Sequence, residues 1–578
     1  MTGPAAPKDP EKARPFFYIL KDKDVFGERQ KDGTGIQFIY ESDGRLINSA
    51  QITGNVTDKE ELTLLETVEG FGRLVHSIGV SVETDRPEET AEFVFQMYGK
   101  KDLYGGGTNL TASLKCDGME HRIYLSDYRW TEDDHVPGQI KILFAAPERM
   151  GKVSVRLFLN DGYEAPPEEE DLVIDMHSEE YCGMISRSLL QLGNPYRIRK
   201  AIEKSKAGKE VTLAYIGGSI TQGAGAIPIH TECYAYKSFQ LFQNRFSTQN
   251  NVRFIKAGVG GTPSELGMIR FDRDVLREGE RPDIVVIEFA VNDEGDETKG
   301  VCYESLVRKV LKLPWKPAVV LLFSVFANDW NLQERLRPVG DLYDLPMVSI
   351  RDAVTPQFSL KCGEGRILSK NQFFYDIFHP NNTGHTIMAD CLQYLFERCD
   401  AAEPARVGTF VEGMTEEQIL SEKLSGPAVI GADFERIFLL DKKNRYVGAK
   451  IRAGSFTSTD IELQSVEMDG SLTQTPEFPY NWMYDGSRLQ MAGFEMEITC
   501  KSLFLIFKDS GETDVGKANV FVNDVYCMTA DPHKNNWLHC NAVLLFWETE
   551  SRSHKVRIAV TEEDRNKKFT ILGFGYTI

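Results

Sequence analysis

The sequence predicts a central α/β domain with a parallel β-sheet, flanked on both sides by β-rich domains. Three successive patterns along the 578 residues indicate this order. Residues up to about 180 alternate apolar and polar side chains, residues 211–350 contain apolar runs separated by helical segments, and the chain beyond about 425 alternates again. A chain of this length exceeds what one hydrophobic core supports, so several domains are expected.

Both flanking regions are predicted to be β-sandwiches, covering residues 1–180 and 425–578. In the first, Val153, Val155 and Leu157 recur at every second position, as on one face of a strand. In the second, 503–507, 520–522 and 556–560 are predicted strands, with a turn at 523–524. Short alternating strands separated by turn residues are typical of sandwiches. A polar segment at 166–171 is the predicted linker to the middle domain.

The middle region, residues 186–402, is predicted to be an open doubly wound sheet. Continuous apolar runs favour strands buried on both faces, and the segments between them have helical periodicity. The predicted strands are 211–216, 254–257, 284–289, 319–326 and 347–350. The predicted helices are 195–206, 234–246, 264–276, 303–311 and a last helix after Thr383. This alternation indicates helices on both faces of a parallel sheet.

Composition excludes several classes of partner. The chain has 66 Lys and Arg against 86 Asp and Glu, which gives a net charge of −20. An acidic chain without a basic cluster is poorly suited to nucleic acid or to anionic membranes. There is no apolar run of about 18 residues and no signal-peptide pattern, so we expect no membrane span and a cytoplasmic location. Neutral substrates fit this composition best.

Ser219 is the candidate nucleophile. The buried strand 211–216 runs into Gly217-Gly218-Ser219, and the glycines allow a sharp turn that would present the serine at the carboxyl edge of the sheet. A phosphate loop is not indicated, because no Gly-Lys-Ser/Thr follows. A dinucleotide-binding loop at 258–263 is not indicated either, since Pro263 stands where the third glycine should be.

Asp376 and His379 are the candidate acid and base. A serine hydroxyl needs a base such as histidine, and the imidazole needs a carboxylate that fixes its tautomer. An aspartate three residues before a histidine on one short loop can reach Nδ1.

Two further segments supply candidate donors to an oxyanion. Asn292 follows the buried strand 284–289, where its amide could face a developing negative charge. Gly261 lies in the glycine-rich segment 258–262, where a backbone N–H is free to do the same.

These four segments, in this order, resemble the SGNH (GDSL-like) hydrolase family. The resemblance covers roughly residues 186–402 and matches Ser219, Gly261, Asn292 and His379 to the family's four blocks, with Asp376 completing the triad. Two positions depart from the usual pattern: the first block reads Gly-Gly-Ser-Ile-Thr, and Ala290 replaces the glycine of Gly-x-Asn-Asp. Neither departure removes a catalytic group.

The resemblance implies a flavodoxin-like three-layer domain and an open site. It implies that Ser219, Asp376 and His379 are catalytic, and that the Ser219 and Gly261 N–H groups and the Asn292 amide form the oxyanion hole. It implies no cofactor and no metal. The remaining histidines also form no metal-binding motif, and we interpret them as surface or structural: His230, His385, His533 and His539.

The flanking domains are similar to carbohydrate-binding β-sandwiches, which bacterial carbohydrate esterases often join to an SGNH core. The expected function is therefore that of a serine esterase that removes O-acetyl groups from carbohydrate, with hemicellulose oligosaccharides of the xylan or mannan type as substrates. The alternatives are a lipid or thioester acyl hydrolase and an O-acetyltransferase with the same triad. The intact triad argues against a non-enzymatic glycan-binding protein.

Two tryptophans in the C-terminal region are candidate substrate contacts. Trp537 and Trp482 each lie in a polar, aromatic segment that reads as a loop. Exposed aromatic faces can stack on sugar rings. The alternative, equally supported by the pattern, is that both tryptophans pack in the core of the sandwich.

Overall fold

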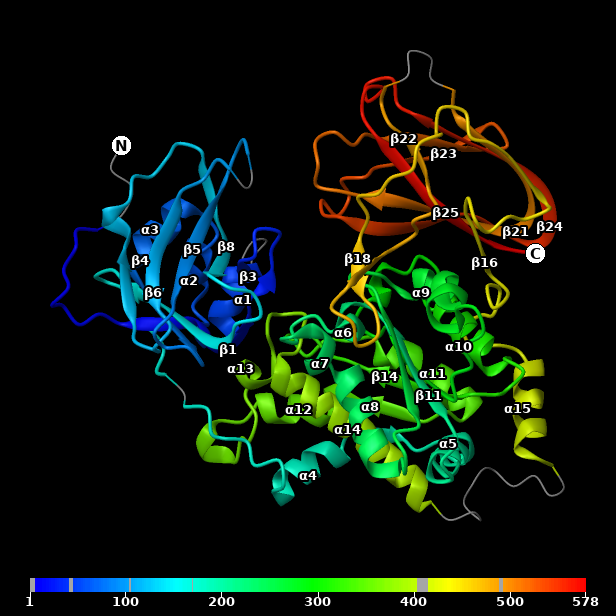
Figure 1. Ribbon diagram of the computed structural model, residues 1–578, viewed down its shortest axis with the longest axis horizontal. Coiled ribbons are helices and arrows are strands. Elements are labelled where there is room, and N and C mark those ends of the chain that lie inside the picture. Colours follow the sequence, from blue (N-terminus) through cyan, green and yellow to red (C-terminus); the bar gives the residue numbers. More distant parts are fainter. Residues whose placement is uncertain (1–5, 41–44, 103–104, 169, 403–413, 488–491) are drawn as a thin grey trace.

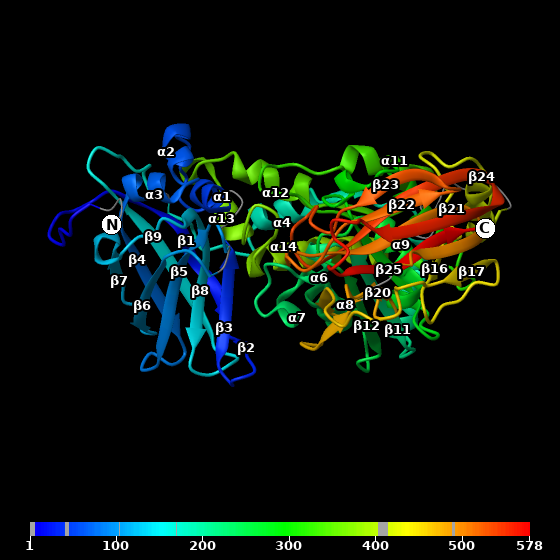
Figure 2. The same ribbon diagram turned by 90° about the horizontal axis from the view of Figure 1, so that it is seen from above.

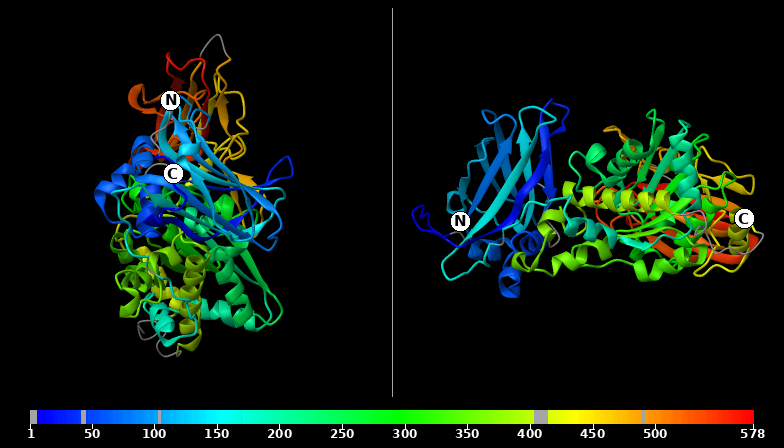
Figure 3. Two further views of the ribbon diagram at one scale, coloured as in Figure 1. Left: turned by 90° about the vertical axis from the view of Figure 1, so that its left-hand side faces the viewer. Right: turned by 90° about the horizontal axis from the view of Figure 1, so that it is seen from below.

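The computed structural model describes residues 6–40, 45–102, 105–168, 170–402, 414–487 and 492–578. An N-terminal β unit, an α/β unit and a C-terminal β unit follow one another along the chain (Figure 1). Seen from above, the N-terminal unit lies at one end of the molecule and the C-terminal unit lies over the α/β unit (Figure 2). Figure 3 shows the same arrangement from the end and from below. Among the described residues, no helix is both long and apolar enough to cross a membrane.

The N-terminal unit contains two antiparallel sheets that enclose one core. Their strand orders are β1-β9-β4-β7 and β2-β3-β8-β5-β6. The alternating residues of β9, such as Val155 and Leu157, meet Phe93 and Phe95 of β5 in this core. The strands are β1 (Phe16–Phe26), β2 (Glu28–Arg29), β3 (Gly35–Tyr40), β4 (Val75–Thr84), β5 (Thr90–Gly99), β6 (Asn109–Lys115), β7 (His121–Tyr124), β8 (Asp134–Phe144) and β9 (Met150–Leu159).

Three short helices in this unit were not predicted from the sequence. They are α1 (Arg45–Ile52), α2 (Lys59–Leu64) and α3 (Val68–Leu74). Their apolar residues, including Leu62 and Phe71, close one end of the same core. The side chains of Asp58 and Thr67 cap α2 and α3. Helices this short are stabilised mainly by such packing, which a local pattern does not reveal.

The α/β unit is built on a six-stranded sheet with the order β10-β15-β14-β13-β11-β12. The five strands from β11 to β15 are parallel, whereas β10 is antiparallel and was not predicted. The parallel strands have the 2-1-3-4-5 order of a flavodoxin-like fold. The strands are β10 (Leu189–Gln191), β11 (Val211–Gly217), β12 (Val252–Gly258), β13 (Ile284–Glu288), β14 (Ala318–Phe323) and β15 (Met347–Ser349).

Helices cover both faces of this sheet, as predicted. Leu213 and Tyr215 of β11 join the core formed with α5, α8 and α14, whereas Ala214 and Ile216 join the core formed with α9, α10 and α11. The helices are α4 (Glu179–Ser186), α5 (Tyr196–Lys206), α6 (Ser219–Gln222), α7 (Ile229–Glu232), α8 (Tyr234–Phe246), α9 (Ser264–Phe271), α10 (Val301–Leu311), α11 (Gln333–Tyr343), α12 (Ile350–Phe358), α13 (Lys370–Phe373), α14 (Asn382–Ala401) and α15 (Glu416–Ser425). Because α4 packs into this core, the α/β unit includes residues before 186.

The C-terminal unit is one bent antiparallel sheet of eight strands rather than two separate sheets. Its longest strands, β21 and β24, pair with shifts of register near residues 500–504, where bulges increase the bend. The strands are β16 (Phe438–Leu440), β17 (Ala449–Arg452), β20 (Trp482–Tyr484), β21 (Phe494–Asp509), β22 (Ala518–Val522), β23 (Val525–Ala530), β24 (His539–Val560) and β25 (Phe569–Thr577). A separate hairpin is formed by β18 (Ser465–Glu467) and β19 (Gln474–Pro476).

The C-terminal unit shares a hydrophobic core with the α/β unit. On β21, Leu503 and Leu505 face the core of the C-terminal unit, whereas Phe504 and Ile506 on the opposite face pack into the core of the α/β unit. The N-terminal unit has its own core and contacts the α/β unit mainly around residues 370–375. The α/β and C-terminal units should therefore unfold together.

Calorimetry of the whole chain should show two transitions, one for the N-terminal unit and one for the other two units. Leu157→Ala removes a fully buried side chain from the N-terminal core, and Ile506→Ala removes one from the shared core. Each substitution should lower the free energy of unfolding of its own unit by about 2–5 kcal/mol, and so lower the midpoint temperature of one transition only. If Ile506→Ala split the second transition into two, the shared core would not make these units cooperative.

Candidate active site

Three neighbouring strands bring the sequence-predicted site residues to one edge of the sheet. Ser219 follows β11, Gly261 follows β12 and Asn292 follows β13. Because β11 lies between β12 and β13, the serine lies between the other two segments. This is the carboxyl edge of a parallel sheet, where α/β proteins place their sites.

Ser219, His379 and Asp376 form a continuous hydrogen-bonded chain. The distance from His379 Nε2 to Ser219 Oγ is 2.9 Å, and His379 Nδ1 lies 2.9 and 3.0 Å from the two oxygens of Asp376. Asp376 Oδ1 also accepts the N–H groups of Phe378 and His379, which fixes the carboxylate within its own loop. With a carboxylate at Nδ1, the proton of the neutral imidazole lies there, so Nε2 is the atom that accepts from the serine.

Asn292 is packed against the glycine that precedes the nucleophile. A Cβ atom at Gly218 would overlap the Asn292 amide, so only glycine fits at this position. Asn292 Oδ1 is buried without a hydrogen-bond partner among the described residues. The amide is therefore placed by contact with Gly218 and by the turn in which Asn292 N–H donates to the Phe289 carbonyl at 2.9 Å.

The next residue, Asp293, ties the Asn292 segment to the Gly261 segment. Its two carboxylate oxygens accept the N–H and the hydroxyl of Ser264, both at 2.8 Å, at the start of α9. Burial and the neighbouring Asp296 raise the pKa of Asp293 to about 8. The two segments that carry the candidate oxyanion donors thus share one buried contact.

The Gly260–Gly261 peptide is held by a residue of the C-terminal unit. Gln464 Nε2 donates to the Gly260 carbonyl at 2.9 Å, and Gln464 Oε1 accepts from the Cys540 N–H at 3.0 Å. In a trans peptide the C=O and the following N–H point in opposite directions, so this bond also sets the direction of the Gly261 N–H. That N–H has no hydrogen-bond partner among the described residues.

Two more side chains of the C-terminal unit cover Gly261. His539 Nε2 donates to the Gly261 carbonyl at 3.0 Å, and burial lowers the pKa of His539 to about 4, so the ring is neutral. Trp537 packs on His539 with 4.5 Å between ring centroids, and a Cβ at Gly261 would lie 2.7 Å from the Trp537 ring. Trp537 remains 45% exposed and therefore lies at the rim of the site.

The structure corrects the prediction for Trp482. This side chain is only 6% exposed and lies in the core of the C-terminal unit, against Phe494 and Phe574. The segment reads as a polar loop in sequence, but Trp482 begins the short strand β20, which pairs with β25. A ring enclosed in this way cannot stack on a sugar.

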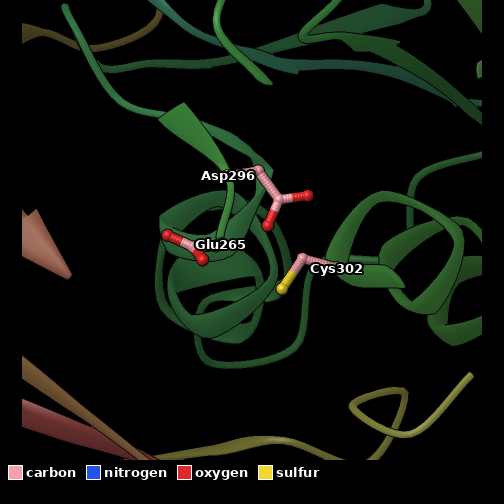
Figure 4. Close-up of side chains that lie close together, drawn as sticks. All are labelled: Glu265, Asp296 and Cys302. Carbon is pink, nitrogen blue, oxygen red and sulfur yellow. The ribbon is translucent and has the colours of Figure 1, made fainter. Parts of the chain in front are cut away.

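A buried cluster of Glu265, Asp296 and Cys302 has a geometry that could suit a metal ion (Figure 4). Asp296 already accepts hydrogen bonds from Thr298 and from the Gly300 N–H. Burial and Asp296 raise the pKa of Glu265 to about 9, and burial raises the pKa of the Cys302 thiol well above its ordinary value. Without a metal ion, Glu265 and Cys302 are therefore protonated near neutral pH, and Asp296 is hydrogen-bonded within its own loop.

Residues 215–387 match the profile of the GDSL-like Lipase/Acylhydrolase family. This part of the chain is a GDSL-like hydrolase domain. The protein is accordingly a carboxylic ester hydrolase. No curated protein matches the chain.

Among solved structures, the fold is similar to that of a two-domain esterase active on acetylated mannans. That structure has 23% identity and a TM-score of 0.54, and the match covers 68% of this chain and 98% of that one. The same esterase co-crystallised with mannopentaose matches with 24% identity, the same coverage and a TM-score of 0.53. An acetylxylan esterase from Geobacillus stearothermophilus matches with 18% identity and a TM-score of 0.26, covering 33% of this chain and 95% of that one.

Sequence reasoning missed the residues that position the Gly261 loop. Gln464 and Gln222 form no local motif, and His539 was interpreted only as surface or structural. Gln222 Oε1 accepts from the Gly260 N–H at 3.0 Å, and its Nε2 donates to Glu467 of the C-terminal unit at 2.9 Å. The contacts of Gln222 with Glu467 and of Gln464 with Gly260 join residues more than 200 positions apart, so only the fold reveals them.

We expect Gln464→Glu to lower kcat on p-nitrophenyl acetate by about tenfold or more with little change in KM. The substitution keeps the size of the side chain but replaces the donor to the Gly260 carbonyl with an acceptor, which disturbs a peptide that acts in the transition state. Gln418→Glu is the matched control, because Glu serves equally well in the capping box that begins α15. Equal activity of the two variants would contradict a positioning role for Gln464.

Proposed function

We propose that this protein is a carbohydrate O-acetylesterase that acts through an acyl-enzyme on Ser219. The observation that carries the proposal is the continuous chain Asp376–His379–Ser219 at the sheet edge where the Gly261 and Asn292 segments also end. Hydrolysis of an ester by this set requires a nucleophile, a base and oxyanion donors, and each has a residue here.

In the first step, Ser219 Oγ attacks the acetyl carbonyl carbon while its proton passes to His379 Nε2. Asp376 stabilises the imidazolium through Nδ1–H. The negative charge that develops on the carbonyl oxygen is met by the N–H groups of Ser219 and Gly261 and by the Asn292 amide. The Ser219 N–H is suited to this because it lies in the first turn of α6, where backbone donors have no intrahelical acceptor.

When the tetrahedral intermediate collapses, the sugar oxygen leaves with the proton held by His379. Water then enters, gives a proton to His379 and attacks the acetyl-serine. When the second tetrahedral intermediate collapses, His379 returns the proton to Ser219 Oγ, which leaves as the free hydroxyl. Acetic acid is released and ionises to acetate. The same donors stabilise both tetrahedral intermediates, so the oxyanion hole contributes to both steps.

A carbohydrate substrate is supported by the surroundings of the triad. Trp537 presents an exposed ring beside Gly261, and aromatic faces are suited to stacking on sugar rings. The similar solved esterase acts on acetylated mannans, which favours hemicellulose oligosaccharides of the mannan or xylan type. The net charge of −20 favours neutral glycans over acidic ones.

Ser219→Ala should lower kcat by at least about 10³-fold, because the triad acts as a unit. Acetate release is measured from acetylated mannan and xylan oligosaccharides and from p-nitrophenyl esters of increasing acyl length. Wild-type protein should favour acetyl over longer acids. A clear preference for long acyl chains would point to a lipid or thioester hydrolase, and near-normal activity of the variant would remove Ser219 from the mechanism.

Trp537→Ala should reduce kcat/KM on acetylated oligosaccharides by about tenfold while changing activity on p-nitrophenyl acetate much less. A sugar ring stacked on the indole would lose binding energy that a small aryl ester does not use. Trp547→Ala is the control, since Trp547 is similarly exposed, at 43%, but packs on Phe434. Equal losses on both substrates would indicate a structural role for Trp537 instead.

A further inference from the structure

A cleft of about 720 Å³ opens beside the triad and is walled by all three units. The α/β unit contributes His379, Asp376 and the segment 224–229. The N-terminal unit contributes residues of β1, β2 and β3, and the C-terminal unit contributes the β18–β19 hairpin. In Figure 1, β3 and β18 stand on either side of α6 and α7. The cleft is far larger than an acetyl group requires.

The N-terminal wall is fixed to the loop that carries the acid and the base. Lys23 is 3% exposed and donates to the Phe374 carbonyl, and Tyr375 packs against the N-terminal core. Thr53 adds a hydrogen bond to Asn371 at 3.3 Å. The wall is therefore held at a set distance from His379 rather than attached by a linker alone.

The opposite wall is fixed as well. In the β18–β19 hairpin, Asp469 accepts from the Lys256 N–H at 2.9 Å and forms a two-pronged ion pair with Arg277 at 2.8 and 2.9 Å. Glu467 accepts from Gln222, which itself contacts the oxyanion loop. Two preformed walls on either side of a reactive group are typical of a ligand cleft.

The lining of the cleft suits a neutral polyhydroxylated ligand. Phe26 and Phe38 offer half-buried aromatic faces, while Glu28, Arg29 and Glu467 offer charged groups that can bond to hydroxyls. Partial desolvation within the cleft and the nearby carboxylate of Glu467 raise the pKa of Glu28, although the side chain stays exposed to solvent. A fatty acyl chain would remove water from the Glu28 carboxylate and from the exposed Arg29–Glu148 ion pair, whose atoms lie 3.0 Å apart, without replacing the lost hydrogen bonds. An anionic ligand would meet the neighbouring carboxylates of Glu28 and Glu467.

We propose that this cleft binds the sugar residues that adjoin the acetylated one, so that the N-terminal unit forms part of the glycan-binding site. This inference rests on the proposed esterase function. It makes Phe26 and Arg29 determinants of chain-length specificity: long oligosaccharides occupy the cleft, whereas acetylated monosaccharides and aryl acetates do not reach it.

The test compares wild type, Phe26→Ala, Arg29→Ala and a control, Arg73→Ala. Arg73 is also exposed on the N-terminal unit but lies on α3, outside the cleft. Substrates are acetylated β-mannan oligosaccharides of increasing length, an acetylated monosaccharide and p-nitrophenyl acetate. We expect kcat/KM of wild type to rise with chain length, and each cleft variant to lose about tenfold on the longest substrate through KM, with no loss on the small esters. Arg73→Ala should match wild type throughout.

Binding provides a second readout that does not depend on turnover. Titration of mannohexaose into Ser219→Ala should show weaker binding when Phe26→Ala or Arg29→Ala is added, and thermal denaturation checks that each variant is folded. Chain-length independence of wild type, or unchanged affinity in both cleft variants, would overturn the inference while leaving the esterase function intact. The inference would also be overturned if wild type preferred esters of long acids and the cleft variants lost that preference. The cleft would then bind an acyl chain. Failure of wild type to release acetate from any glycan would instead refute the proposed function.

Discussion

The arrangement of the site depends on one buried arginine at the edge of the sheet. Arg270 is 1% exposed and donates to the Gly217 carbonyl at 2.8 Å and to the Ala257 carbonyl at 2.7 Å. These carbonyls lie at the ends of β11 and β12, where the chain leaves the ladder to form the Ser219 turn and the Gly261 loop. The Gly217 carbonyl also accepts from the Val259 N–H at 3.2 Å. The two charged donors of Arg270 add stronger hydrogen bonds to these strand ends. The guanidinium thus allows two adjacent strands to end together beneath the reactive groups.

The charge of Arg270 is balanced by a network that reaches the C-terminal unit. Asp274 pairs with Arg270 at 3.0 Å and with Arg273, which in turn pairs with the buried Glu477. Burial alone would raise the pKa of Asp274, but the two arginines hold it below its ordinary value. Because breaking a buried ion pair leaves an uncompensated charge, these partners must remain together. The C-terminal unit is therefore part of the support of the strand ends, in addition to sharing their hydrophobic core.

The features that could be predicted from the sequence are those that a short stretch of residues determines by itself. Apolar runs predicted β11 to β15, and the residues that follow them predicted Ser219, Gly261 and Asn292, because strand ends of a parallel sheet converge. His379 and Asp376 were predictable because they lie three positions apart. Gln464 and Arg270 were not, since their partners lie on other elements and no spacing records the contact. Trp482 and Trp537 occur in similar polar segments, yet one is enclosed and the other exposed. Burial of this kind is decided by tertiary packing, which overrides local composition.

The two flanking units contact different loops of the same candidate active site. In the N-terminal unit, Lys23 donates to the Phe374 carbonyl, close to Asp376 and His379 in the chain. This contact helps to fix the position of the loop that carries the candidate acid and base. The C-terminal unit holds the Gly260–Gly261 peptide through Gln464 and His539, and so fixes the direction of the Gly261 N–H, a candidate donor to the oxyanion. In this chain the triad and the Gly261 segment lie on loops at the carboxyl edge of the sheet. Here each of the two loops is held by a separate β unit, and other residues of the same two units, on β1 to β3 and on the β18–β19 hairpin, line the cleft beside His379. The two β units therefore do two things at once: they hold the loops that carry the triad and Gly261, and they form two walls of the cleft beside His379.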